Sequence, residues 1–224
     1  MLQTPVEIEI KLPVIQPAMA RRRLRRLGAK TLGRVHERNT LFDTPANALK
    51  RSGRLLRVRS IEKAGPPGRG RARSRAGTAG PGARSITGLL TYKGPAKAPA
   101  GAGRYKVREE VEVEIVRPEA AERILIELGF RPSFRYEKYR TSFRLPGLPL
   151  LAVELDETPI GAFFELEGPK ASIDRAARWL GYRPRDYLTA SYYELFLPER
   201  RRLGLDAGAM LFPASTKSIS PLFS

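Results

Sequence analysis

The sequence of 224 residues contains no cysteine and a single histidine, His36. The absence of cysteine excludes disulfides and thiolate metal sites, and a lone histidine excludes a multi-histidine metal centre. Any metal site in this chain would therefore use oxygen ligands, which favour Mg²⁺ or Mn²⁺ over zinc.

Long apolar segments are missing as well. No stretch approaches the roughly 20 apolar residues of a transmembrane helix. The first residues, Met-Leu-Gln-Thr-Pro, lack the basic and apolar regions of a signal peptide. We therefore expect a cytoplasmic protein without a membrane partner. Neither GxxxxGK[ST] nor GxGxxG occurs, so the sequence predicts no common glycine-rich phosphate loop.

Positive charge, in contrast, is abundant. The net charge of +18 indicates polyanionic partners such as nucleotides, polyphosphate or nucleic acid. Part of this charge lies in Arg21–Arg26, within a predicted helix at 18–27, and part between Arg69 and Arg84. The second group belongs to a Gly/Pro/Ala/Arg/Ser-rich stretch, about 62–85, which we predict to be a disordered insertion. Solvated charges of this kind need no specific ligand, so net charge alone does not identify the function.

Alternation of apolar and polar residues predicts roughly eight strands, at 6–12, 31–43, 54–61, 86–93, 105–116, 131–145, 150–157 and 162–168. Helices are predicted at 18–27, 48–52, 118–129, 171–180 and 191–197. The strands follow one another through turns and short loops, which favours an α+β fold built on an antiparallel β-barrel with flanking helices. Periodicity is lost from Leu203 onward, and we expect residues 201–224 to form a poorly ordered tail.

The polar face of these strands is almost purely ionisable. In the first strand Glu7, Glu9 and Lys11 alternate with Ile8 and Ile10. Corresponding rows are Arg57 and Arg59; Lys93; Arg108, Glu110 and Glu112; Lys138 and Arg140; Glu154 and Asp156; and Glu165 and Glu167. An ordinary antiparallel strand also has a solvated face, but such faces include more Ser, Thr and Gln. Carboxylates and cations on facing strands can instead bind a hard metal ion and a polyphosphate together.

These motifs, in this order, resemble those of the CYTH superfamily, also called the triphosphate tunnel metalloenzymes. Glu7-x-Glu9-x-Lys11 resembles its ExExK signature. The later motifs also match: Phe42-Asp43-Thr44-Pro45, Leu56-Arg57-Val58-Arg59, Thr91-Tyr92-Lys93-Gly94-Pro95, Arg108-x-Glu110-x-Glu112, Lys138-x-Arg140, Glu154-x-Asp156 and Glu165-x-Glu167. The resemblance extends from about Val6 to Leu197. The superfamily includes class IV adenylyl cyclases, thiamine triphosphatases and inorganic triphosphatases.

The resemblance implies an eight-stranded tunnel over residues 1–200 that binds a triphosphate-containing small molecule with Mg²⁺ or Mn²⁺. Its metal ligands would be Glu7, Glu9, Glu165 and Glu167, with Glu154 and Asp156 for a second metal and Glu110 and Glu112 as additional candidates. Its phosphate-binding residues would be Lys11, Arg57, Arg59, Lys93, Arg108, Lys138 and Arg140. One departure is Glu154, where related sequences often carry Asp.

Individual residues carry further predictions. Lys11 is our candidate for a base-like role toward the attacking water, since a lysine among cations could have a lowered pKa, although the neighbouring Glu9 opposes a large shift. Tyr136 is expected to pack rather than to bind, and His36 to be structural or on the surface. Trp179 is expected in the core.

Two reactions and one non-catalytic role remain open at this point. A hydrolase needs to bind only the phosphates and a water, whereas a cyclase must also orient the nucleoside. The stretch Phe42–Leu49 has no Arg-Asp-Phe and no preceding histidine, which favours a triphosphatase acting on tripolyphosphate, thiamine triphosphate or a nucleoside triphosphate over a class IV adenylyl cyclase. The third alternative is a polyphosphate- or RNA-binding module. The acidic rows argue against nucleic acid, and the sequence leaves monomer and homodimer open.

Overall fold

The structure is a computed structural model that describes residues 6–63, 87–98, 103–204, 206 and 208–213. The predicted insertion lies outside the described residues except for Glu62 and Lys63, which end a strand.

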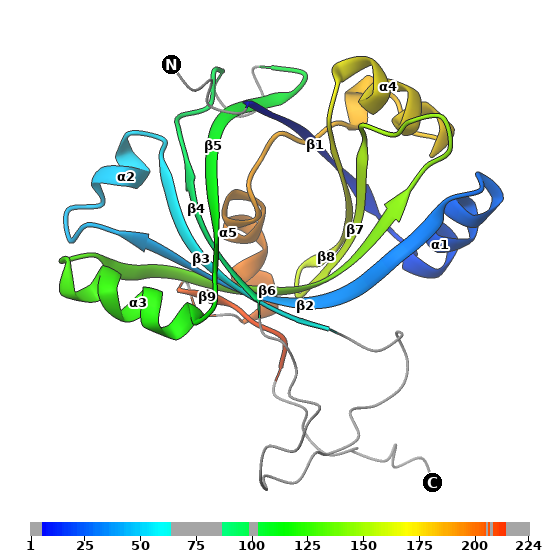
Figure 1. Ribbon diagram of the computed structural model, residues 1–224. Coiled ribbons are helices and arrows are strands. Elements are labelled where there is room, and N and C mark those ends of the chain that lie inside the picture. The colour runs from blue at the N-terminus through cyan, green and yellow to red at the C-terminus, as the bar shows by residue number, and fades with distance from the viewer. Residues whose placement is uncertain (1–5, 64–86, 99–102, 205, 207, 214–224) are drawn as a thin grey trace, which may run out of the picture.

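Eight antiparallel strands form a closed barrel (Figure 1). They are β1 (Val6–Val14), β2 (Lys30–Asp43), β3 (Leu55–Lys63), β4 (Thr87–Lys93), β5 (Lys106–Ile115), β6 (Arg131–Arg144), β7 (Ala152–Thr158) and β8 (Gly161–Glu167). Their order around the barrel is β2-β3-β4-β5-β1-β8-β7-β6, and the pairing of β2 with β6 closes it. The predicted antiparallel eight-stranded barrel is confirmed.

Side chains of the strands alternate between the inside and the outside of the barrel. On β1 the alternation separates Glu7, Glu9 and Lys11 from Ile10 and Leu12, which are fully buried on the other face. The register places Glu9 opposite Glu167, Lys11 opposite Glu165 and Glu7 opposite Arg108. Charged residues from three strands therefore meet on one inner wall.

The hydrophobic core lies outside this charged interior, between the strands and the helices that cover them. Helices α1 (Pro17–Arg26) and α4 (Lys170–Trp179) lie on the same side of the barrel (Figure 1). Leu24 of α1 and Ile173 of α4 are fully buried in one cluster with Ile10, Leu12 and Val153. Helix α3 (Pro118–Glu127) buries Leu125 against Phe42 and Val58. Burial of these apolar side chains stabilises the fold while leaving the interior free for polar groups.

Trp179 corrects one prediction, because its residue is 38% exposed rather than part of the core. Its neighbours Ala176 and Ala177 occupy the buried face of α4 instead. A helix buries only one stripe of side chains, and the last turn of α4 places Trp179 beside that stripe.

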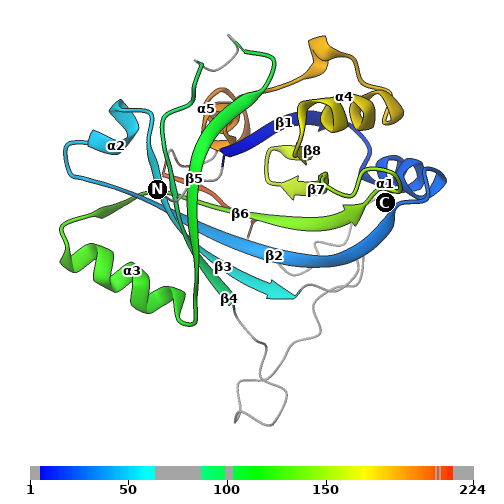
Figure 2. The ribbon, with the colours of Figure 1, turned by 45° about the horizontal axis from the view of Figure 1, so that its top comes forward.

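Two short helical segments, α2 (Ala48–Arg51) and the 3-10 turn Pro184–Asp186, precede the last helix, α5 (Tyr192–Leu203). Ser191 caps α5 by accepting a hydrogen bond from the Glu194 N–H, and the Glu194 carboxylate accepts one from the Ser191 N–H. The helix continues six residues beyond its predicted end and stops at Gly204, whose φ of 64° is left-handed. Figures 1 and 2 place α5 within the ring of strands, between β5 and β8.

The predicted poorly ordered tail also needs correction. Arg201 and Arg202 belong to α5, and β9 (Ala209–Met210) pairs in parallel with Arg135 and Tyr136 of β6. β7 pairs with residues 139–143 of β6. The part of β6 before residue 139 therefore has a free edge on that side, where β9 pairs. Met210 is fully buried in an aromatic cluster made by Phe134, Tyr136, Phe163, Tyr192 and Phe196. Residues 214–224 lie outside the described residues.

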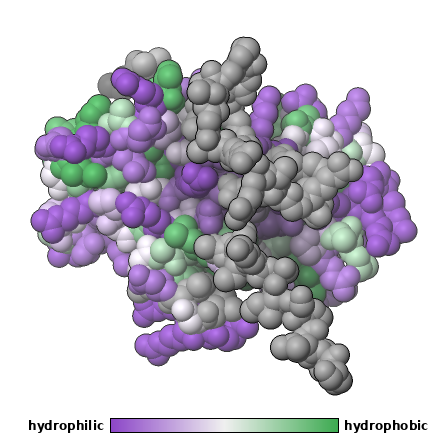
Figure 3. All heavy atoms as spheres, turned by 90° about the horizontal axis from the view of Figure 1, so that it is seen from below, coloured by the Kyte–Doolittle hydropathy of each residue, from purple (hydrophilic) through white to green (hydrophobic). Residues whose placement is uncertain are grey.

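No helix in the described part of the chain is long and apolar enough to cross a membrane. Seen from below, hydrophilic side chains dominate the described surface, with smaller hydrophobic areas between them (Figure 3).

Candidate active site

A cavity of about 230 Å³ inside the barrel, which we call the tunnel, is lined almost entirely by ionisable side chains. Eight are Lys or Arg and six are Glu. The cations are Lys11, Arg57, Arg59, Lys93, Lys106, Arg108, Lys138 and Arg140, and the carboxylates are Glu7, Glu9, Glu110, Glu112, Glu165 and Glu167. The structure thus brings together all the predicted site residues except Glu154 and Asp156.

Charge is distributed unevenly around the tunnel. All six carboxylates come from β5, β1 and β8, which are adjacent in the barrel, whereas β3, β4 and β6 contribute cations and no carboxylate. The tunnel therefore has an acidic wall and a basic wall, and a ligand between them would contact both.

Lys11 lies within the acidic wall. Its Nζ is 3.2 Å from Glu9 Oε1 and 3.4 Å from Glu165 Oε2. Burial by itself would lower the pKa of Lys11, but Glu165 and Glu9 together raise that pKa above its ordinary value. The predicted lowering of the Lys11 pKa is therefore wrong, because its nearest neighbours are carboxylates rather than cations.

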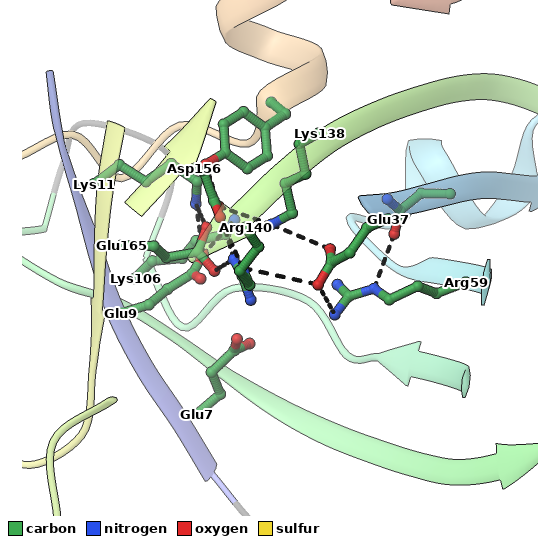
Figure 4. A network of polar contacts seen from close by, with 12 residues as sticks. Glu7, Glu9, Lys11, Glu37, Arg59, Lys106, Lys138, Arg140, Asp156 and Glu165 are labelled. Atoms are coloured by element: carbon green, nitrogen blue, oxygen red, sulfur yellow. Dashed lines mark hydrogen bonds and ion pairs between the residues drawn. The ribbon is translucent and has the colours of Figure 1, made fainter. Parts of the chain in front are cut away.

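Asp156 of β7 is the centre of a buried network that lies close to Lys11 and Glu165 (Figure 4). Its carboxylate accepts hydrogen bonds of 2.7 Å from Lys138 Nζ, from Arg140 Nε and NH2, and from the Tyr192 hydroxyl. Asp156 is fully buried and does not line the tunnel. It holds cations in position from behind, which differs from the metal-ligand role that the resemblance implies.

Glu37, which the sequence analysis missed, has a similar position beneath the basic wall. Its carboxylate lies 3.3 Å from Arg59 NH1 and 3.5 Å from Lys138 Nζ (Figure 4). Burial would raise the pKa of Glu37, but Arg59 and Lys138 hold that pKa well below its ordinary value. Asn39 also accepts a hydrogen bond of 3.0 Å from Arg59 Nε.

Negative charge is least compensated at Glu167 and Glu7. Burial, followed by the charges of Glu7 and Glu165, raises the pKa of Glu167 to about 8. Glu167 makes no ion pair or hydrogen bond with any described residue. Glu7 contacts Lys93 Nζ at 2.6 Å, yet burial and the charge of Glu9 raise its pKa to about 6. An added cation would relieve this repulsion.

The donor set fits a hard divalent cation, because all available ligands are carboxylate oxygens. The side chains as arranged do not converge: within the described residues no three Asp, Glu or His groups are close enough to hold a metal ion. Glu154 pairs with Glu165 across β7 and β8. Its Oε2 is buried without a hydrogen-bond partner, and burial raises its pKa. Glu154 therefore adds a carboxyl group beside the tunnel and not to its lining.

Two arginines predicted to bind phosphate have different surroundings. Arg57 donates to the Tyr136 hydroxyl at 3.4 Å and to Thr91 Oγ1 at 3.2 Å, and its NH2 lies 3.7 Å from Glu112 Oε2. Arg108 donates to the Gly94 carbonyl at 2.7 Å and to the Gly53 carbonyl at 2.6 Å, so it also joins two loops. Tyr136 both packs in the aromatic cluster and lines the tunnel, which extends the predicted packing role.

Lys106 and Tyr192 are further residues that the sequence analysis missed. Lys106 Nζ is 3.0 Å from Glu9 Oε1, and the alternation with Arg108 and Glu110 could have identified it. Tyr192 comes from α5 and no strand pattern predicts it. His36, by contrast, is structural as predicted: its Nε2 is 2.8 Å from Glu137 Oε2, its ring stacks on Tyr139, and it does not line the tunnel.

A second cavity, of about 640 Å³, shares Leu55, Lys106, Arg108 and Ser191 with the tunnel. We call it the mouth cavity. Its lining includes residues from the ends of β2, β3, β5 and β6, from the loop after β4, and from the helices α2 and α5.

Comparison with known proteins decides the family. The chain matches the CYTH domain over residues 5–180. It belongs to the CYTH family. Among curated protein sequences, none matches the chain.

Solved structures share this fold. A Pyrococcus horikoshii protein is 22% identical, with a TM-score of 0.66 and coverage of 87% of this chain and 99% of the other. A Vibrio parahaemolyticus protein labelled a candidate adenylate cyclase is 18% identical, with a TM-score of 0.64 and the same coverage. A Hippeastrum protein labelled a candidate adenylyl cyclase with a dominant triphosphatase activity is 21% identical, with a TM-score of 0.55 and coverage of 89% and 96%. Identities this low support the shared CYTH fold alone.

Proposed function

We propose that this CYTH protein is a cytoplasmic enzyme that hydrolyses a triphosphate-bearing substrate in its tunnel with Mg²⁺ or Mn²⁺. The observation that carries the proposal is the pair of facing walls, one acidic and one basic, inside a closed barrel. A triphosphate carries about four negative charges, which arginine forks and lysine ammonium groups bind well.

The residues have separate roles in this proposal. Arg57, Arg59, Lys138 and Arg140 bind phosphate oxygens. Asp156 and Glu37 keep the last three of these cations oriented, so that little reorganisation is needed. The acidic wall would hold the divalent cation through Glu7 and Glu167, where negative charge is least compensated, with Glu9 and Glu165 beside them. When bound, the cation would offset charge on the phosphates. Lys11 remains protonated between its two carboxylates and serves as a phosphate contact rather than a base.

In the hydrolysis, a water oxygen bonds to phosphorus while the bond from that phosphorus to its bridging oxygen breaks. The bridging oxygen leaves with the rest of the substrate, and the proton lost by the water is released to solvent or phosphate. Positioning of the triphosphate between the two walls supplies the main catalytic effect.

Adenylyl cyclase activity is the second candidate, because the mouth cavity beside the tunnel provides room for a nucleoside. Cyclisation releases pyrophosphate and cyclic AMP, whereas hydrolysis at the terminal phosphorus releases orthophosphate. Purified protein is therefore incubated with tripolyphosphate or ATP, with Mg²⁺, with Mn²⁺ or with EDTA, and the products are separated. We expect metal-dependent release of orthophosphate. Formation of cyclic AMP with an equal amount of pyrophosphate would show that the protein is a cyclase and contradict our assignment. Binding without turnover under all conditions would indicate a polyphosphate-binding module.

Arg57→Ala tests the basic wall. Loss of a hydrogen bond to a charged group should weaken triphosphate binding by about 1.5–3 kcal/mol, or roughly 10- to 150-fold. Arg54→Ala is the matched control, since Arg54 is an exposed arginine of the mouth cavity that does not line the tunnel. Equal effects of the two variants on tripolyphosphate would place Arg57 outside the binding site.

A further inference from the structure

Helices α1 and α4 form a continuous outer surface that is rich in arginine. Figures 1 and 2 place the two helices side by side on the outside of the barrel. Arg23 Nε of α1 donates to the carbonyl of Trp179, the last residue of α4, at 3.0 Å, and the Tyr182 hydroxyl donates to the Pro13 carbonyl at 2.7 Å. These contacts join the chain around α1 to the chain around α4. We call the following exposed residues of this surface the basic face: Ile15, Met19, Arg22, Arg25, Arg26, Arg175, Arg178 and Trp179.

The positive charge of the basic face is not balanced by nearby carboxylates. Among the described residues none of its arginines forms an ion pair, and α1 contains no acidic residue. The carboxylates beside it have other partners: Glu157 pairs with Arg21 and Arg34, and Asp174 pairs with Arg104. The face therefore presents uncompensated positive charge to solvent and suits an anionic partner.

Apolar side chains lie among these arginines. Ile15 is 95% exposed, Met19 58% and Trp179 38%. Met19, Arg22 and Arg26 follow one outward stripe of α1, because these positions recur every three or four residues, and Ile15 lies just before the helix. The basic face thus combines cations with exposed apolar groups, which is the composition of protein surfaces that bind at the boundary between lipid headgroups and acyl chains.

The basic face is separate from the candidate active site. None of its residues lines the tunnel or the mouth cavity. Helix α2, which contributes to the mouth cavity, lies on the other side of the barrel from α1 (Figure 1). A partner bound to the basic face would therefore leave the mouth cavity open.

We infer that the basic face binds the surface of an anionic membrane, with its arginines at the lipid phosphates and with Ile15, Met19 and Trp179 at the edge of the acyl chains. The sequence-based expectation of no membrane partner rested on spanning helices and signal peptides, and peripheral binding needs neither. The two aliphatic side chains favour lipid over nucleic acid. A nucleic acid could contact the arginines and stack on Trp179, but it would leave Ile15 and Met19 in water. The inference does not depend on the proposed function.

Trp179 is the only tryptophan of the chain, so its fluorescence reports directly on the basic face. The full-length protein is titrated without substrate with vesicles of phosphatidylcholine alone and with vesicles of equal parts phosphatidylcholine and phosphatidylglycerol. Sedimentation measures binding in parallel. We expect binding to the anionic vesicles only, a shift of Trp179 emission to shorter wavelength, and quenching of that emission by lipids with brominated acyl chains. Added salt should weaken the binding, because it screens the charges.

A charge-reversal variant locates the binding surface. Arg22→Glu combined with Arg26→Glu should weaken binding to anionic vesicles about 25-fold or more, since one basic residue near such a surface contributes roughly fivefold. The matched control is Arg117→Glu combined with Arg131→Glu, which should weaken binding less than about fivefold. Arg117 and Arg131 are exposed residues that flank α3, away from α1 (Figure 1), and their variant has the same net charge. Both variants keep the basic residues of 64–86, so any attraction by that stretch is the same in the two.

A second variant tests the apolar groups without changing the charge. Ile15→Ser combined with Met19→Ser should weaken binding to anionic vesicles about tenfold, because less apolar area is removed from water. A single-stranded RNA oligonucleotide is titrated into the same variants for comparison. Circular dichroism and melting temperature verify that each variant is folded.

The outcomes are decisive for the basic face. Absence of binding to anionic vesicles, or equal losses in the two charge-reversal variants, would overturn the inference. Tight RNA binding together with vesicle binding that is unchanged by Ile15→Ser and Met19→Ser would also overturn it and would assign the face to nucleic acid. Selective loss in the basic-face variants, with quenching of Trp179 by the brominated lipids, supports the membrane surface. None of these results affects the assignment of the tunnel.

Discussion

The tunnel and the mouth cavity are neighbours in one barrel, yet their buried charged groups are neutralised by different kinds of partner. Around the tunnel most charges are balanced by other side chains, as Asp156 behind the lining is by Lys138 and Arg140. At the mouth the buried Asp43 is balanced by backbone N–H groups of the chain around α2. The difference shows how one fold can pair charged side chains with one another, where an ionic ligand can share their contacts, and elsewhere fix a carboxylate with backbone groups. Charges that neutralise each other can be redirected to a ligand, whereas a carboxylate held by backbone groups shapes a loop.

The largest expected effect distinguishes these two buried carboxylates. Asp156→Asn should reduce the free energy of unfolding by about 3–5 kcal/mol, because it leaves Lys138 and Arg140 without their common anion. Asp43→Asn should cost about 1–2 kcal/mol, since the amide oxygen still accepts hydrogen bonds from neutral N–H groups. Urea unfolding at neutral pH measures both. Equal losses would contradict the distinction between the two regions.

Glu167 provides the next prediction, which concerns pH. Burial and the charges of Glu7 and Glu165 raise the pKa of Glu167 in the folded state to about 8, against an ordinary value of 4.5. The folded protein thus binds this proton more tightly than the unfolded chain, and stability contributed by the protonated group is lost as the pH rises from 4.5 to 8. Glu167→Gln should therefore stabilise the metal-free protein at pH 8.5 by roughly 2–4 kcal/mol, since one pKa unit corresponds to about 1.4 kcal/mol. At pH 4.5 the variant and the wild type should be equally stable.

Thermal unfolding with and without Mn²⁺ completes this test. Mn²⁺ should raise the melting temperature of the wild type at pH 8.5 and raise that of Glu167→Gln much less. The matched control is Glu109→Gln, which should behave as the wild type. Glu109 is an exposed residue of β5 between Arg108 and Glu110, which line the tunnel. A pH-independent difference between Glu167→Gln and the wild type would exclude repulsion between carboxylates as its cause.

The smallest expected effect is that of a substitution in the mouth cavity. Lys50 is exposed, and its Nζ donates to the Tyr193 hydroxyl at 2.9 Å. Lys50→Gln should change the free energy of unfolding by less than about 0.5 kcal/mol, as is usual for exposed positions. It should alter KM for tripolyphosphate less than twofold. A loss comparable to that of Arg57→Ala would mean that the mouth contributes to phosphate binding and that the division into two regions is wrong.

Much of the barrel follows from the sequence because a strand has a period of two. The alternation of Glu7, Glu9 and Lys11 with Ile8 and Ile10 fixes which residues face inward once a barrel closes. The same rule predicts the inward position of Arg57, Arg59, Lys138 and Arg140. The CYTH family assignment, carried by these rows, is confirmed by the match over residues 5–180.

The partners of these residues could not be obtained in the same way. Alternation assigns a side chain to a face but does not determine which side chain from another strand lies opposite. The sequence therefore placed Lys11 among cations, while the register sets it between Glu9 and Glu165 and raises its pKa. It likewise implied that Asp156 is a metal ligand, although the Asp156 carboxylate accepts hydrogen bonds from Tyr192, Lys138 and Arg140.

The sequence by itself determined the strands, their charged inner faces and the family. Only the tertiary structure decided what α5 and the residues after it do: Tyr192 enters the tunnel wall, Tyr193 enters the mouth and Met210 is buried against β6. The physical reason is that strand periodicity is local, whereas burial and charge pairing depend on residues far apart in the chain. Met210 lies 74 positions from Tyr136, its partner across β9 and β6, and no local pattern records that contact.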